Sequence, residues 1–107
     1  MRTDILISLL CESPLSGVYV FGSWVRRKDP QDVDLLIIYN PECCPIELAI
    51  HLRRQIVETA SRALGLPAHT ILLTVAEEKQ VDFCASESCV PFLEVLAIRG
   101  ALGEIGN

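Results

Sequence analysis

The sequence predicts a mixed α/β (α+β) fold, with a small mixed β-sheet packed against helices. Half of the 107 residues are hydrophobic, which suits one folded domain spanning residues 1–107. Two short runs, residues 17–22 and 32–39, are rich in β-branched and aromatic residues and have the pattern of buried strands. Between residues 45 and 64 the apolar spacing changes to that of a helix.

An N-terminal helix is predicted between a residue that can cap its start and two residues that break helices. Thr3 or Asp4 can cap it, and Pro14 and Gly17 end it before the first strand. Its apolar side consists of Ile5, Leu6, Leu9 and Leu10.

The long central helix is predicted to occupy residues 45–64. Pro45 suits its first turn, and Gly65 suits its C-terminal cap. Its predicted apolar stripe consists of Leu48, Leu52, Ile56, Ala60 and Leu64. The remaining predicted elements are a strand and two short helices, at residues 69–75, 76–85 and 90–98.

Connection lengths predict how the strands pair. The eight residues between Ser23 and Asp32 are too few for a parallel crossover, which needs about a dozen or more. The first two strands are therefore expected to be antiparallel neighbours, which brings Gly22 and Ser23 beside Asp32 and Asp34. The third strand follows through a long helix, which favours a parallel arrangement with the second. Its start is expected at the same end of the sheet.

Two aspartates, Asp32 and Asp34, precede the apolar run "LLII". Alternate residues of a strand share a face, so the two carboxylates are expected about 7 Å apart along one face. Such a pair is repulsive and costly to desolvate. For a single aspartate a solvated strand end is a sufficient explanation. For two, a bridging cation is the more economical one, and Mg²⁺ takes one or two carboxylates together with substrate phosphates.

The connection before the aspartates has features of a phosphate site. Gly22 lets a ligand approach the backbone closely, and Ser23 can cap a short helical turn whose free N–H groups attract anions. Arg26, Arg27 and Lys28 could hold outer phosphates, although such a triplet taken alone is more often a solvated loop.

The stretch "FGSWVR…DVDLLII" resembles the nucleotidyltransferases of the DNA polymerase β superfamily, especially the small branch of minimal nucleotidyltransferases. The resemblance implies the nucleotidyltransferase fold, with Gly22 and Ser23 binding nucleotide phosphate. It also implies that Asp32 and Asp34 ligate Mg²⁺ or Mn²⁺, and that Arg26 matches the family's loop arginine.

The chemistry implied by this resemblance is transfer of a nucleoside monophosphate from an NTP, with ATP as the first candidate, to a hydroxyl. The small branch often pairs with a helical partner protein of the HEPN type in toxin–antitoxin or defence modules. A partner protein is therefore the expected acceptor.

The sequence departs from the family pattern where a third carboxylate is expected, at the start of the third strand. There the chain reads "LPAHTILL", with His69 and Thr70. Glu77 and Glu78 lie about 20 Å further along and suit a helix start instead. His69 could be a metal ligand, a general base or a strand-end residue with no catalytic task. The connection is also shorter than usual, and Arg27 replaces a common glycine.

Charge and cysteine content narrow the function classes. The net charge of −5 argues against general nucleic-acid binding. Five cysteines without a CxxC pair are expected to be reduced thiols in a cytoplasmic protein. No apolar run reaches the length of a membrane span. The high apolar content leaves a homo-oligomer possible.

Three hypotheses remain from the sequence. The first is a Mg²⁺-dependent nucleotidyltransferase that uses Asp32, Asp34 and His69. The second is a catalytically degenerate protein of the same fold that binds nucleotide. The third is an antitoxin or interaction subunit that acts by contact alone.

Overall fold

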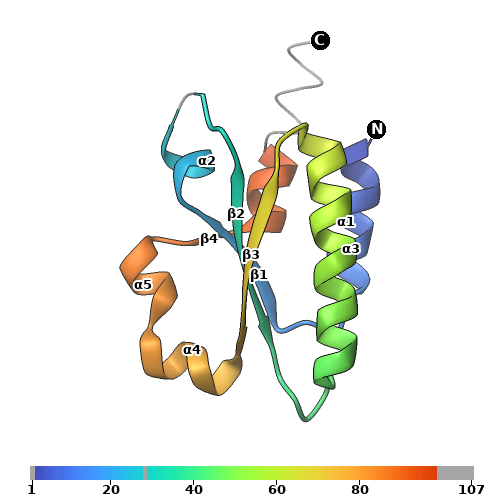
Figure 1. The fold of residues 1–107 in the computed structure, drawn as a ribbon, viewed down its shortest axis with the longest axis vertical. Coiled ribbons are helices and arrows are strands. Elements are labelled where there is room, and N and C mark those ends of the chain that lie inside the picture. The colour runs from blue at the N-terminus through green and yellow to red at the C-terminus, as the bar shows by residue number, and fades with distance from the viewer. Residues whose placement is uncertain (1, 28, 99–107) are drawn as a thin grey trace.

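A four-stranded mixed β-sheet forms the centre of the protein in the computed structural model, which describes residues 2–27 and 29–98 (Figure 1). Lys28, which the sequence suggested as a phosphate ligand, lies outside the described residues. The elements in chain order are α1 (Arg2–Glu12), β1 (Gly17–Phe21), α2 (Ser23–Arg26), β2 (Val33–Tyr39), α3 (Ile46–Leu64), β3 (Ala68–Thr74), α4 (Val75–Val81), α5 (Phe83–Glu87) and β4 (Val90–Pro91). A further helical stretch covers residues 92–98.

The strand order in the sheet is β3-β2-β1-β4. β1 pairs antiparallel with both β2 and β4, whereas β2 and β3 are parallel. The mixed α+β class, the antiparallel first pair and the parallel second pair are thus confirmed. The last residues of β1 and the first residues of β2 and β3 lie at the same end of the sheet.

Helices α1 and α3 lie side by side over one face of the sheet, and α4 and α5 lie on the opposite side (Figure 1). Val33, Leu35 and Ile37 of β2 are fully buried in the core beneath α1 and α3. Because side chains alternate along a strand, Asp34 must point to the opposite face. Within the same core as Val33, Leu35 and Ile37, the ring of Trp24 in α2 packs edge-to-face against the ring of Phe92, with ring centroids 5.8 Å apart.

The predicted stripe of α3 is correct in part. The helix follows Pro45 and ends at Gly65, whose φ of 69° is the left-handed conformation expected of a C-terminal cap. Its buried residues are Ala49, Leu52, Ile56 and Ala60. Leu48 is 38% exposed, so its assignment to the core was wrong. The small Ala49 takes its place and is fully buried.

The predicted boundaries of α1 and β3 need small corrections. α1 begins at Arg2, so Thr3 and Asp4 lie within its first turn rather than at its cap. β3 ends at Thr74, which caps α4 through a reciprocal pair of hydrogen bonds with Glu77. This capping box supports the assignment of Glu77 to a helix start.

The C-terminal third differs more from the prediction. The expected helix at residues 76–85 is divided into α4 and α5 by Asp82, whose backbone is left-handed. Residues 90 and 91 form β4 rather than the start of a helix, because they pair with Tyr19 and Val20 of β1. Pro91 is tolerated there because β4 is an edge strand. No helix in the described part of the chain is long and apolar enough to cross a membrane.

Candidate functional site

The predicted site residues other than the loop arginine meet at the end of the sheet where β1 ends and β2 and β3 begin. In the register, Phe21 of β1 is paired with Asp34 of β2, and Asp34 is paired with His69 of β3. Paired residues project to the same face, so Asp34 and His69 lie side by side on the face away from α1 and α3. We call the group Gly22, Ser23, Asp32, Asp34 and His69 the carboxylate edge.

Gly22 lies directly against the side chain of Asp34. A Cβ atom at position 22 would be only 2.5 Å from Asp34 Oδ2, and the φ of Gly22 is +75°. Both the space and the left-handed backbone therefore require glycine here. Because position 22 has no side chain, the backbone there can lie against the Asp34 carboxylate.

Ser23 and His69 lie on either side of Asp32. The Ser23 hydroxyl donates to Asp32 Oδ1 over 3.2 Å, and His69 Nε2 is 3.7 Å from Asp32 Oδ2. The prediction that Ser23 caps α2 was wrong, because Gly22 occupies the cap and α2 has no side-chain cap. The His69 side chain is 64% exposed and that of Asp32 35%, so this side of the edge is open to solvent.

The electrostatics of the carboxylate edge disfavour two negative charges. Burial raises the pKa of Asp34 above its ordinary value of 3.8, and the neighbouring charge of Asp32 raises it further. His69 acts in the opposite direction and lowers the pKa of Asp34. The pair therefore gains from a cation between or beside its oxygens.

The chemistry of the donors fits Mg²⁺ in the form of a metal–nucleotide complex. Among the described residues, no three His, Cys, Asp or Glu side chains are grouped so that they could hold a metal ion by themselves. Two carboxylates suffice when substrate phosphates supply further oxygen ligands, which is how Mg²⁺ is commonly bound. Asp32 and Asp34 are the residues that would hold it.

Arg26, in α2 with Ser23, makes its described contact outside the carboxylate edge. Its Nη2 donates to the backbone carbonyl of Glu87 over 2.8 Å, which ties α2 to α5. A second contact with α5 joins the rings of Phe21 and Phe83, which meet edge-to-face with centroids 4.9 Å apart. Neither contact was predicted from the sequence. One uses a backbone carbonyl 61 residues away, and no residue pattern signals such a partner.

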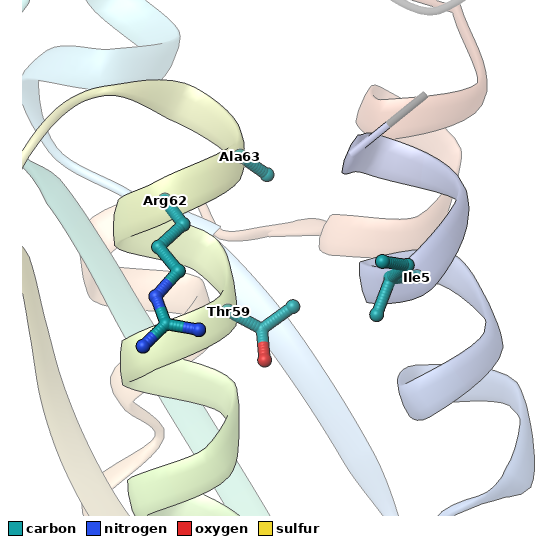
Figure 2. A pocket seen from close by; sticks show the side chains of 4 residues that line it. All are labelled: Ile5, Thr59, Arg62 and Ala63. Carbon is teal, nitrogen blue, oxygen red and sulfur yellow. The ribbon is translucent and has the colours of Figure 1, made fainter.

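A hollow in the described part of the structure lies away from the carboxylate edge. A pocket of about 400 Å³ separates α1 from α3, and Ile5 and Ala63 point into it from the two helices (Figure 2). Thr59 and Arg62 complete its described lining, which contains no carboxylate. Its described lining therefore offers no carboxylate ligand for the metal of a metal-bound nucleotide.

Comparison of the chain with family models, curated proteins and solved structures gave no match.

Proposed function

We propose that this chain is a Mg²⁺-dependent nucleotidyltransferase of the minimal, antitoxin-type branch. It would move a nucleoside monophosphate from an NTP, with ATP as the first candidate, to a hydroxyl on a partner protein. The observation that carries the proposal is the carboxylate edge itself. Three strand ends bring a glycine, a serine hydroxyl, two aspartates and a histidine together, away from the apolar core.

Each residue of the edge has a task in this proposal. Gly22 lets the backbone lie against the Asp34 carboxylate, and the Ser23 hydroxyl can turn from Asp32 to a phosphate oxygen. Asp32 and Asp34 would hold Mg²⁺ or Mn²⁺. When bound, that metal would neutralise charge on the phosphates and on the reacting oxygens.

The reaction would be an in-line displacement at the α-phosphorus. The acceptor oxygen forms a bond to this phosphorus while the bond to the bridging oxygen of the β-phosphate breaks, and pyrophosphate leaves. His69 is the candidate for accepting the hydroxyl proton, because a neutral imidazole can do so and this side chain is largely exposed.

The openness of the edge supports a macromolecular acceptor. His69 and Asp32 are accessible from outside, so a hydroxyl on another protein can approach without entering a deep cleft. A helical HEPN-type toxin is the partner that the sequence resemblance suggests. No general affinity for nucleic acid is proposed.

A second candidate function is nucleotide or partner binding without transfer. Its supporting observation is His69, which stands beside Asp34 in the register where a third carboxylate is expected. With a histidine in place of the third carboxylate, the site would hold the metal more weakly. The protein would then still bind nucleotide but transfer it slowly.

Transfer of label from ATP labelled at the α-phosphate distinguishes the candidates. The purified protein is incubated with Mg²⁺, labelled ATP and fractions of a lysate of its source cells. The first candidate predicts a labelled protein band that is lost in Asp34→Asn and retained in the control Asp29→Asn. Mg²⁺-dependent binding of ATP without any labelled band supports the second candidate. Absence of both ATP binding and label contradicts the first candidate and the nucleotide-binding form of the second.

A further inference from the structure

Residues 82–88, which we call the α5 segment, are held in a strained backbone conformation at both ends. Asp82 has a φ of 50° and Ser88 a φ of 54°, and they are the two non-glycine residues with positive φ in the described chain. Both residues are C-terminal caps of short helices, and their N–H groups donate to the carbonyls of Glu78 and Cys84. Left-handed backbone is common at a helix end, although it costs a non-glycine residue more than glycine. The backbone strain in the segment is therefore small and favours release only weakly.

Beyond its own helix and cap bonds, a small number of side-chain contacts tie the α5 segment to the rest of the described chain. None of the described residues of α4 or α5 is fully buried, so apolar packing alone does not fix the segment. The Cys84 N–H donates to Glu78 Oε1 over 3.1 Å, and Phe83 meets Phe21 edge-to-face. The charged contact is the bond from Arg26 to the Glu87 carbonyl.

Two of these contacts originate from the scaffold of the carboxylate edge. Phe21 immediately precedes Gly22, and Arg26 follows Ser23 by three residues in α2. Residues three apart on a helix lie on the same face, so the Arg26 side chain extends from the face that also presents Ser23. A phosphate bound at Ser23 would lie within the reach of this long side chain.

We propose that Arg26 alternates between two acceptors, the Glu87 carbonyl in the free protein and the polyphosphate of a bound nucleotide, so that nucleotide binding releases the α5 segment. The inference rests on the proposed function and adds regulation of the same site. An anionic phosphate accepts a stronger, charge-assisted hydrogen bond from guanidinium than a neutral carbonyl does. The strain at Asp82 and Ser88 favours the same direction.

The chain contains its own reporters for this release. Cys84 lies in the α5 segment and Cys89 follows it, and both are half-buried with free thiols. Burial and the adjacent Cys84 raise the pKa of Cys89 to about 12, which suppresses its reactivity while the segment is docked. Cys11 and Cys43 are exposed and serve as internal references.

The test measures alkylation of each thiol by iodoacetamide at pH 8, followed by mass spectrometry of peptides. The probes are Mg²⁺–ATP and inorganic tripolyphosphate with Mg²⁺. Either probe should accelerate labelling of Cys84 and Cys89 in the parent protein by about tenfold or more relative to the exposed references, because loss of a charged hydrogen bond changes an opening equilibrium by about that factor. Arg26→Met should label quickly without any probe, and the control Arg54→Met, at an exposed position of α3, should behave as the parent does.

Calorimetric titration with Mg²⁺–ATP, run on the same samples, separates the two claims. If ATP binds and labelling of both thiols is unchanged, the release is wrong and the proposed function stands. If ATP does not bind, the proposed function fails and the release fails with it. Slow labelling of folded Arg26→Met, equal to the parent without probe, also overturns the inference.

Discussion

Replacing Asp34 by asparagine should stabilise the protein while it removes the metal–nucleotide site. The substitution keeps the size of the side chain and its fit against Gly22, and it removes the charge that Asp32 repels. Residues that bind ligands often cost stability in this way, because the ligand rather than the fold compensates their charge. The two opposite effects of one substitution make this prediction specific.

The charge repulsion gives the part of the stabilisation that can be worked out, and removal of the desolvation cost of Asp34 adds to it. For a separation of about 7 Å, the rise of two residues in an extended chain, two unit charges repel by about 0.6 kcal/mol in water and by about 2.4 kcal/mol at an effective dielectric constant near 20. Asp34 is half-buried, which places the repulsion between these limits, at ~1 kcal/mol. For a domain of this size, that gain raises the melting temperature by about 4 °C.

The gain should depend on pH in a defined direction. Because burial and Asp32 raise the pKa of folded Asp34 above 3.8, the folded protein holds this proton more tightly than the unfolded chain does. The parent therefore loses stability as the pH rises from about 3.8 through the raised pKa. The advantage of Asp34→Asn should be complete at pH 7 and should vanish below about pH 4.

Thermal unfolding of the parent, Asp34→Asn and Asp29→Asn at pH 7 and near pH 4 measures this difference. Asp29 is exposed and lies in the same connection, so its replacement changes the net charge equally without affecting the carboxylate edge. Asp34→Asn should melt higher than both other proteins at pH 7 only. An Asp34→Asn variant that is no more stable than Asp29→Asn at pH 7 would refute the reasoning.

Three further substitutions test other parts of the structure. His69→Asp should increase Mg²⁺ affinity in calorimetric titrations and raise label transfer from ATP, because it supplies a third carboxylate, and unchanged affinity would contradict that role. Gly22→Ala should lower the free energy of unfolding, measured with denaturant, by about 2 kcal/mol or more. Gly65 has a similar φ but open space around it, so Gly65→Ala should cost only about 1 kcal/mol. Equal losses would show that the close approach at position 22 does not matter. Phe92→Ala should cost about 3–4 kcal/mol and change the fluorescence of Trp24, so an unaltered melting curve would argue against this packing.

The sequence allowed the sheet and the carboxylate edge to be predicted because their determinants are local. The short connection before Asp32 excluded a parallel pairing, and the long helix after β2 favoured one. The period-two pattern then placed Asp34 opposite the buried face of β2. Given these three facts, the meeting of Asp34 with His69 follows from geometry.

The C-terminal third was predicted less well because its determinants are not local. Asp82 divides a helical pattern by adopting a left-handed backbone, which no period reveals. Val90 and Pro91 become a strand only because β1 offers a free edge. Arg26 likewise binds a carbonyl whose residue type is irrelevant to the contact.

Calorimetric titration with ATP, with and without Mg²⁺, tests whether the carboxylate edge binds a metal–nucleotide complex. We expect Mg²⁺-dependent binding to the parent and to Asp29→Asn, and its loss in Asp34→Asn although that variant is folded and at least as stable. Binding of Mg²⁺–ATP to Asp34→Asn with the affinity of the parent would contradict the assignment of the carboxylate edge as a nucleotide site.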